Sequence, residues 1–352
     1  MKKACYFGIY DPKHWRTRVV TRGLKRAGYE VIECRVDPRK VVGWRKYVEL
    51  VNSFRKIQDI DLIVVGFPGY LAVIVARLIT RKPIVFDAYI SYFDGIRDRK
   101  NYKLTNPVMW VAWLIDFIDG LCADVVLTIN NVYKDFFVQS LLVSGRKVEV
   151  LHKGADEEVF YPRQSSTKEF LSIGWWGSYI PLHGLDVIVD SAKLLSSEDL
   201  RMHFFGSGQL KNQIENKIKE EAITNIELHS FVSQGDLVQE IANFDVVLGI
   251  FSPEPKALRC VTNKVYEAMA MGKSIITEDS PANREIFTHK ENVYLVEPGN
   301  PVALAKAIKE LASNDKLRAY LGQNAQKLFE SRFTIEKVEE EFVGIINRHA
   351  NV

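Results

Sequence analysis

The sequence predicts an α/β fold built from two Rossmann-like domains, followed by a C-terminal helix. The chain has 352 residues, more than one ordinary core of about 150 residues needs. Apolar residues make up 47% of it, enough to fill two such cores. Short apolar runs alternate with amphipathic stretches of helical period along both halves of the chain. This alternation is typical of parallel sheets that carry helices on both faces.

The first domain is expected over residues 1–165. Strand patterns occur at residues 3–9, 31–36, 62–67, 84–87, 125–129 and 148–152. Helical patterns lie between them, at residues 15–27, 44–57, 70–79, 106–121 and 132–142. The polar segment Tyr161 to Ser166 contains a proline and is typical of a linker. Strands and helices therefore alternate as they do in one doubly wound sheet.

The second domain is expected over residues 166–332, with a separate C-terminal segment at 333–352. Strand patterns recur at residues 170–174, 202–206, 226–229, 246–251, 274–277 and 293–296. Helices are expected at residues 184–195, 210–221, 237–242, 262–271 and 302–311, with a short one starting at Ser280 and a last one over 333–348. The alternation thus repeats and predicts a second parallel sheet.

The stretch Thr262 to Thr277, TNKVYEAMAMGKSIIT, is the most informative part of the second domain. Thr262 and Asn263 are favourable helix N-caps, Gly272 ends the helix, and a buried strand follows. A helix N-terminus has unpaired N–H groups and a partial positive charge, to which Asn263 and Lys264 add an amide and a full charge. We therefore expect Thr262, Asn263 and Lys264 to bind a phosphate group.

Glu267 lies one turn further along the same helix face, three residues after Lys264. Its carboxylate could accept hydrogen bonds from vicinal hydroxyls just beyond a bound phosphate, so a diphosphate followed by a ribose fits this order. The alternative is a capped core helix on which Lys264 and Glu267 form a solvated ion pair. Spacing alone does not separate the two interpretations.

The segment EAMAMGKSIIT, with Arg284-Glu285 and with NVYLVEP at residues 292–298, resembles the donor-site signature of the family-four retaining glycosyltransferases, the glycosyl transferases group 1. The motif GADEEVF at residues 154–160 is similar to the sequence at the domain junction of that family. The resemblance implies the GT-B architecture, in which two Rossmann-like domains face a central cleft and the C-terminal helix crosses back onto the first domain. It also implies a hexosyltransferase-like enzyme that uses a nucleotide diphosphate sugar.

The resemblance also implies roles for single residues. The family has two glutamates eight positions apart near the donor; Glu267 matches the second, which contacts the ribose, and Arg259 stands at the first. A loop usually supplies an Arg and a Lys to the diphosphate, and Gly177 and His183 stand at those positions. Two cations are therefore missing, and we expect Lys256, Arg259 and Lys264 to restore the charge.

The loop Trp175 to Gly184 is expected to hold the diphosphate by main-chain groups. The N–H groups of Gly177 and Ser178 would cradle it, with Gly184 closing the loop. His183 would donate a hydrogen bond, either when protonated or as a neutral N–H. Gly206 and Val232 stand where the family borders the nucleotide base. Gly206 could equally belong to an ordinary turn.

Asp87 follows a strand of the first domain and is the carboxylate best placed for the reacting centre, since the carboxyl ends of parallel strands face the ligand. We therefore take Asp87 and His183 as the catalytic candidates. A structural hydrogen bond to a loop is the alternative for Asp87. The pair Asp59 and Asp61 precedes its strand, at the wrong edge for a metal, so no metal site and no cofactor are expected.

Charge is shared unevenly along the chain. Residues 1–165 hold 27 Lys and Arg against 18 Asp and Glu, a net +9, although the whole chain carries only +3. This excess favours an anionic acceptor or lipid headgroups, and a solvated basic surface is the alternative. It comes without a nucleic-acid-binding motif, so we expect no nucleic-acid partner.

Four widely spaced cysteines and an N-terminus typical of a first strand favour a reduced, cytoplasmic protein. The most apolar run, Pro107 to Ile115, is shorter than the ~20 residues of a membrane span, and two aspartates follow it. It could make shallow contact with the inner membrane face, whereas a packed helix is the ordinary interpretation.

These features favour transfer of a sugar from a nucleotide diphosphate sugar to a hydroxyl acceptor, with retention and without metal, in synthesis of a cell-surface polysaccharide or glycolipid. Because Arg259 replaces the usual glutamate, two alternatives stay open: a nucleotide-sugar epimerase of the same fold, and a binding module without turnover. The sequence does not identify the sugar, the base or the acceptor.

Overall fold

The computed structural model describes all residues except 13, 101, 166–169 and 350–352. Contacts divide the chain into two compact units, Met1–Lys153 with Ile335–Val352, and Gly154–Thr334. The boundary between them lies before the GADEEVF motif, whereas we expected it at residue 165. Ala155 forms an isolated bridge with Thr334, and its N–H donates to the carbonyl of Phe333, which ties this segment to the second unit. The expected domain start at 166 lies outside the described residues.

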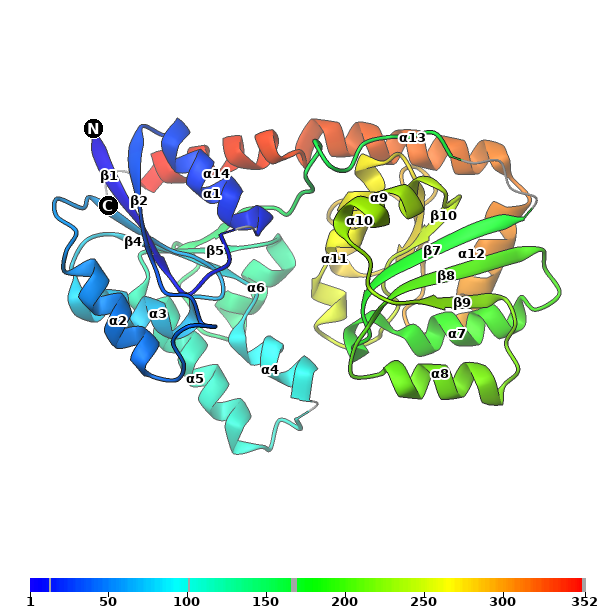
Figure 1. Ribbon diagram of the computed structural model, residues 1–352, viewed down its shortest axis with the longest axis horizontal. Helices are drawn as coiled ribbons and strands as arrows, with labels where there is room; N and C mark the ends of the chain where they lie inside the picture. Colours follow the sequence, from blue (N-terminus) through cyan, green and yellow to red (C-terminus); the bar gives the residue numbers. More distant parts are fainter. Residues whose placement is uncertain (13, 101, 166–169, 350–352) are drawn as a thin grey trace. The chain divides into compact units, whose positions relative to one another are not determined.

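Unit 1 contains a six-stranded parallel sheet in the order β2-β1-β3-β4-β5-β6 (Figure 1). Its strands are β1 (Lys2–Gly8), β2 (Tyr29–Arg35), β3 (Leu62–Val65), β4 (Ile84–Tyr89), β5 (Val125–Thr128) and β6 (Val148–Val150). Their residues are mostly buried and apolar, as strands covered on both faces require. The expected order of strands is therefore confirmed in this half of the chain.

The helices of unit 1 are α1 (Trp15–Arg26), α2 (Arg45–Phe54), α3 (Tyr70–Ile79), α4 (Tyr92–Lys100), α5 (Pro107–Cys122), α6 (Asn131–Gln139) and α14 (Ile335–His349). Helix α4 lies where the sequence predicted a loop. The Asp116 carboxylate accepts the N–H groups of Tyr92 and Phe93 at 2.8 Å each, and Ser91 Oγ accepts that of Asp94 at 3.0 Å. A side chain from another helix thus caps α4, which no local pattern reveals.

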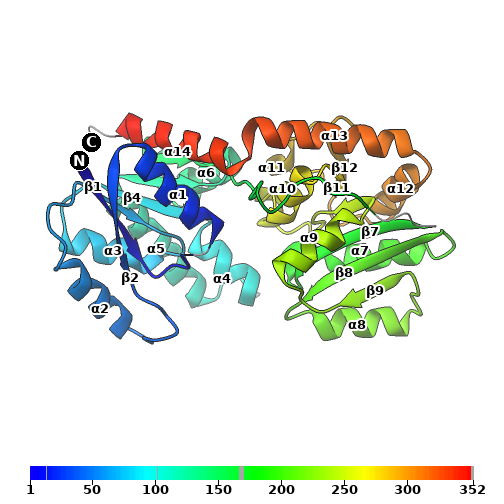
Figure 2. The ribbon, with the colours of Figure 1, turned by 45° about the horizontal axis from the view of Figure 1, so that its top comes forward.

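Helix α14 packs along α1, as Figure 2 shows, so the C-terminal helix belongs to unit 1. The contact is close, because a methyl group added at Gly23 would lie 2.6 Å from Cδ1 of Phe342. The buried carboxylate of Glu339 pairs with Arg22 at 2.7 Å and with Arg26 at 3.2 Å. The predicted position of this segment on the first domain is therefore confirmed for α14.

Unit 2 contains a second six-stranded parallel sheet in the order β12-β11-β10-β7-β8-β9. Its strands are β7 (Leu171–Ser178), β8 (Leu200–Ser207), β9 (Ile226–His229), β10 (Val246–Leu248), β11 (Ser274–Glu278) and β12 (Tyr294–Val296). Strand β7 continues to Ser178, so Trp175 to Ser178 belong to a strand and not to the predicted loop. The order reverses between β7 and β10, the position at which sheets of this kind bind ligands beyond their carboxyl ends.

The helices of unit 2 are α7 (Leu185–Leu194), α8 (Lys211–Glu220), α9 (Gln234–Ala242), α10 (Asn263–Ala270), α11 (Pro281–Arg284), α12 (Pro301–Ala312) and α13 (Asp315–Arg332), with short 3-10 helices η1 (Pro181–His183) and η2 (Ala257–Arg259). Helices α7, α8 and α12 cover one face of the sheet over the main apolar core. Helices α9 and α10 lie on the other face (Figure 1). Helix α13 occupies a segment to which the sequence analysis assigned no element.

The α1–α14 contact generates a stability prediction. Gly23→Ala will lower the free energy of unfolding by about 1–3 kcal/mol, because its new methyl group overlaps Phe342. Gly344→Ala is the matched control on α14, where the methyl group meets only Arg348 Nη1 at 3.8 Å. Helix propensity then favours alanine, so the control will keep or raise stability. Urea unfolding measures both, and equal stability of the two variants would contradict this packing.

Candidate functional site

Two loops meet at the position where the strand order of the second sheet reverses. The N–H of Phe251, after β10, donates to the carbonyl of His183, after β7, at 3.1 Å. Gly184 has φ +61°, and a methyl group on it would lie 2.6 Å from the N atom of Ser252. Gly184 is therefore required by backbone conformation and by contact between the loops. Helix α10 begins beside this junction, after β10.

Lys264 lies in the first turn of α10, and its side chain is buried, with 4% exposed. Nζ stands 3.9 Å from the centre of the Trp175 ring, a cation–π contact. Within the part of the chain that the structure describes, Nζ has no hydrogen-bond partner. Burial lowers the pKa of Lys264 well below its usual value, although Glu267 acts in the opposite direction. An anion bound at Nζ would provide the hydrogen-bond partner that this ammonium group lacks in the described structure.

Gly177 brings the loop backbone to the same place. A methyl group on Gly177 would lie 3.2 Å from Cε1 of His183 and 3.5 Å from Nζ of Lys264. Its φ of +146° also favours glycine. Gly177, His183 and Lys264 therefore converge, as predicted. Ser178 follows at the exposed end of β7.

His183 has a defined tautomer in this site. Its Nδ1 lies 2.6 Å from the carbonyl oxygen of Ser178, and a carbonyl only accepts, so Nδ1 carries the proton. Burial, followed by the charges of Lys264 and Lys256, lowers the pKa of His183 well below its usual value. The neutral ring therefore presents an unprotonated Nε2, which cannot donate to a phosphate. The expected donation from a neutral ring is thus wrong, and only a protonated His183 could donate through Nε2.

The N-terminus of α10 has an unused hydroxyl group. Thr262 stands at the N-cap position, but its side chain makes no capping hydrogen bond. Its Oγ1 is buried and, among the described residues, has no partner. The expected capping by Thr262 is therefore wrong, and its hydroxyl stays available to an anion near the partial positive charge of the helix N-terminus. Asn263 begins the helix and is half-buried.

Glu267 occupies the next turn of α10. Its Oε2 accepts the indole N–H of Trp176 at 2.7 Å, and burial raises its pKa above the usual value. The solvated Lys264–Glu267 pair that spacing left open does not form, since the ammonium group is buried against Trp175 and the carboxylate bonds Trp176. The Glu267 carboxylate lies one turn beyond Lys264 and could accept hydrogen bonds from the hydroxyl groups of a ligand.

The remaining donor-binding candidates lie around this group. Gly206 belongs to β8, where an added methyl group would lie 2.0 Å from the carbonyl oxygen of Gly177, so its role in the structure is strand packing. Val232 is partly exposed in the loop after β9. Lys256 and Arg259 are half-buried at η2, and the charge of Lys256 reaches His183.

Asp87 belongs to unit 1 and is fully buried. Its carboxylate pairs with the buried guanidinium group of Arg16, at 2.9 Å from Nη2 and 3.0 Å from Nε. Arg16 also donates to the carbonyls of Leu151 and His152. This placement fits the structural alternative for Asp87, while its catalytic role stays an untested prediction. Sequence reasoning missed Arg16 because its partner stands 71 positions away.

Comparison with known proteins finds glycosyltransferases, as the sequence resemblance predicted. Residues 162–328 match the family model of the glycosyl transferases group 1. The capsular polysaccharide biosynthesis glycosyltransferase CapM of Staphylococcus aureus is 23% identical over 78% of this chain and 72% of its own length. The putative glycosyltransferase EpsD of Bacillus subtilis is 22% identical over 99% and 93%. An uncharacterised glycosyltransferase of Methanocaldococcus jannaschii is 26% identical over 61% of this chain and 57% of its own length.

Solved structures show the same fold. Anabaena HepE in complex with UDP and glucose aligns over 100% of both chains with a TM-score of 0.72 at 16% identity. Sucrose-phosphate synthase of Thermosynechococcus elongatus aligns over 99% of both chains with a TM-score of 0.78 at 12% identity. Two parallel six-stranded sheets with flanking helices are the GT-B architecture, so the predicted fold class is confirmed.

The buried lysine and histidine generate a pH prediction. Burial holds both pKa values low in the free protein, and a bound anion will raise them, so inorganic pyrophosphate will bind with proton uptake and bind more weakly as pH rises. Calorimetry in two buffers of different ionisation enthalpy measures the uptake. Lys264→Met will weaken binding roughly 10-fold or more, the value of a charge-assisted hydrogen bond. Lys306→Met, at an exposed site on α12, is the matched control. Buffer-independent heats would contradict the assignment.

Proposed function

We propose that this chain, a glycosyltransferase of GT-B architecture whose residues 162–328 match the family model of the glycosyl transferases group 1, transfers a sugar from a nucleotide diphosphate sugar to a hydroxyl acceptor. The observation that carries this proposal is the buried ammonium group of Lys264, which lacks a partner in the described structure and faces Gly177 and Trp175. A diphosphate would provide both the hydrogen-bond acceptor and the negative charge for this group. Anabaena HepE, a protein of the same fold, has been solved with UDP and glucose.

The proposed donor lies along the start of α10. Its diphosphate contacts Lys264 and the Thr262 hydroxyl, and its ribose hydroxyls donate to Glu267 one turn further. In the reaction the bond from the anomeric carbon to the diphosphate breaks and the acceptor oxygen forms the new bond. Negative charge then grows on the leaving diphosphate, where Lys264 and the helix N-terminus are already oriented. We propose that this arrangement replaces a catalytic metal and that the sugar keeps its anomeric configuration.

The test is a panel of nucleotide sugars with product analysis, together with Glu267→Ala. Released nucleoside diphosphate and a glycosylated acceptor identify the transferase, in the presence of EDTA as in its absence. Glu267→Ala will weaken donor binding by about 1.5–3 kcal/mol, measured by calorimetry, because a charge-assisted hydrogen bond is lost. Trp176→Phe is the matched control, since it removes the protein's own donor to Glu267 and leaves the carboxylate.

Four results would reject parts of this proposal. An altered free sugar nucleotide would identify an epimerase, and binding without turnover a binding module, which Arg259 in place of the family glutamate keeps open. Unchanged affinity of folded Glu267→Ala would reject the ribose contact. Activity lost in EDTA and restored by Mg²⁺ would reject metal-free transfer.

We further propose that the acceptor is anionic or lipid-linked and is met at an acidic bilayer surface by α5. This helix exposes an apolar stripe at helical spacing, formed by Val108, Trp110, Val111, Leu114 and Leu121. Trp110 is 68% exposed and Leu121 61%. Such a stripe lies in the interfacial region of a membrane, as amphipathic helices do.

The two aspartates of α5 do not face outward with that stripe. Asp116 and Asp119 are buried, and burial raises the pKa of Asp116 to about 7 and that of Asp119 to about 9. These two carboxyl groups therefore lie inside unit 1 and do not interrupt the exposed apolar stripe. Unit 1 holds 28 Lys and Arg against 19 Asp and Glu, a net +9, which complements anionic lipid. None of the helices built from described residues is long and apolar enough to cross a membrane.

Vesicle sedimentation tests the bilayer contact. The protein will bind acidic vesicles more than neutral ones, and binding will weaken as salt shortens the Debye length to about 8 Å near 0.15 M. Trp110→Asp with Leu114→Asp will reduce binding, because both side chains leave the apolar interface. Val302→Asp, at an exposed apolar site on α12, is the matched control. Equal sedimentation with both vesicle types would reject contact with an acidic bilayer and would favour a soluble anionic acceptor.

A further inference from the structure

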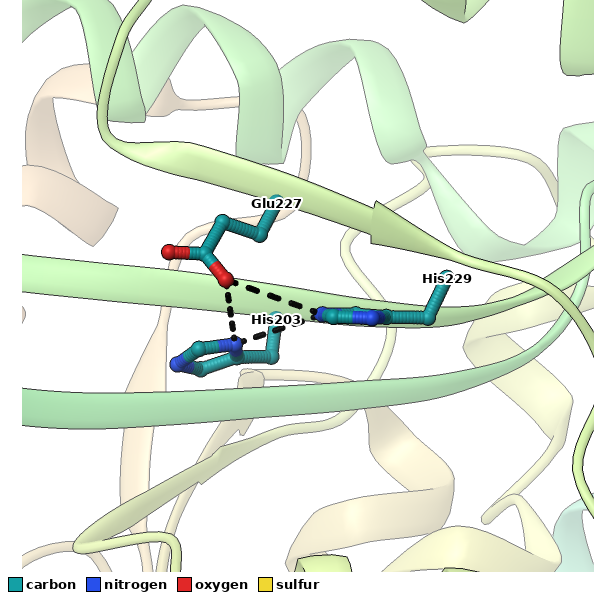
Figure 3. Close-up of side chains that lie close together, drawn as sticks. All are labelled: His203, Glu227 and His229. Atoms are coloured by element: carbon teal, nitrogen blue, oxygen red, sulfur yellow. Dashed lines mark hydrogen bonds and ion pairs between the residues drawn. The ribbon is translucent and has the colours of Figure 1, made fainter.

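Two histidines and a glutamate meet on neighbouring strands of the second sheet, although the sequence predicted no metal site. His203 lies on β8, and Glu227 and His229 lie on β9. The register sets His203 opposite Glu227 and places His229 two residues further along the same strand. Since side chains alternate between the faces of a strand, all three stand on one face. Figure 3 shows the three side chains turned toward one another.

The separations between their nearest ligand atoms suit a bound metal ion. His203 Nδ1 lies 3.4 Å from His229 Nε2 and 3.4 Å from Glu227 Oε2, and the latter two atoms are 3.9 Å apart. These values exceed the 2.7–3.2 Å of a well-formed hydrogen bond. A tetrahedral Zn²⁺ with bonds of about 2.0–2.1 Å holds its ligand atoms about 3.3–3.4 Å apart. Two of the three separations therefore match, and the third needs a shift of only a few tenths of an ångström.

Aromatic neighbours hold both imidazole rings in this arrangement. The His229 ring stacks on Phe205 with centroids 4.4 Å apart and planes 11° apart. The His203 ring is stacked 6.0 Å from Phe244, and the two histidine rings are themselves stacked at 5.6 Å. The rings are thus oriented without a metal, which lowers the conformational entropy lost on binding one. Glu227, half exposed, can make the remaining small adjustment.

We propose that His203, Glu227 and His229 form a binding site for a divalent transition metal, and that Zn²⁺ is the ion that fits best. Two imidazole nitrogens and one carboxylate oxygen are a ligand set that zinc uses, and they exclude the hard ions Mg²⁺ and Ca²⁺, which prefer oxygen ligands. Three protein ligands leave one position for water. The ion would tie the edge strand β9 to β8 and so hold the loop that carries Val232.

This site is independent of the proposed transfer reaction. None of its three residues belongs to the group around Lys264, and its ion would act on stability and not on the leaving diphosphate. The alternative is an ordinary cross-strand pair of histidine and glutamate. The two explanations differ in their response to metal, because only a metal site needs all three side chains at once.

The test uses the full chain without an affinity tag, stripped of metal by a chelator. Titration with Co²⁺ will produce the intense visible absorption of a four-coordinate site, saturating at one equivalent, and Zn²⁺ will displace it. Zn²⁺ at about 100 times its Kd will raise the ratio of folded to unfolded protein about 100-fold, seen as a higher Tm. Binding will weaken at acid pH, because only the neutral imidazole coordinates a metal.

Substitutions at the exposed positions keep the test clear of folding defects. His229→Gln and Glu227→Gln will each weaken Zn²⁺ binding at least about 10-fold. Even the loss of a residue that only hydrogen-bonds a metal ligand lowers metal affinity by about that factor, and these two residues are direct ligands in the proposal. His289→Gln, at an exposed histidine in the same unit, is the matched control and will bind as the wild type does. Binding that persists in the folded His203→Gln/His229→Gln double variant, or absence of binding to the wild type, would overturn the proposal. Turnover in EDTA is measured separately and bears only on the transfer reaction.

Discussion

The ammonium group of Lys264 is the constraint on which the second unit depends. Burying an unpaired ammonium group is strongly unfavourable, and among the described residues the Trp175 ring and the nearby Glu267 charge offset it. Helix α10 adds the partial positive charge of its own N-terminus, where the Thr262 side chain makes no capping hydrogen bond. The free protein therefore holds electrostatic free energy that an anion would release. This is the condition under which a site binds strongly and stabilises a leaving group without rearranging.

The first unit resolves its buried charges in the opposite way. Arg16 and Asp87 form a fully satisfied pair, in which the guanidinium group also bonds two carbonyls at the end of β6. Such a pair is weak as a source of stability but specific in geometry, since removing one partner leaves the other charge buried. Asp116 holds the start of α4 through two N–H groups. Buried charge positions elements in unit 1, whereas in unit 2 it prepares a site.

Helix α5 buries its two carboxyl groups and exposes apolar side chains. Its aspartates face inward and its apolar stripe faces outward, the reverse of an ordinary surface helix. Raised pKa values let both carboxyl groups take a proton near neutral pH, which reduces the penalty of their burial. The outward face is then free of acidic residues, and the basic unit around it can approach an anionic surface without repulsion.

Periodicity and turn chemistry in the sequence determined the strands, most of the helices and the helix that begins at Asn263, because these depend on local hydrophobic pattern and capping residues. The family resemblance placed Gly177 and His183 beside Lys264, and the structure brings these three residues together. Tertiary structure alone decided the rest. Asp116 caps α4 from another helix, Arg16 reaches Asp87 across the first sheet, and His203 meets His229 only through the pairing of β8 with β9. These contacts join residues far apart in the chain, and their energies depend on burial and atomic distance, which sequence spacing does not contain.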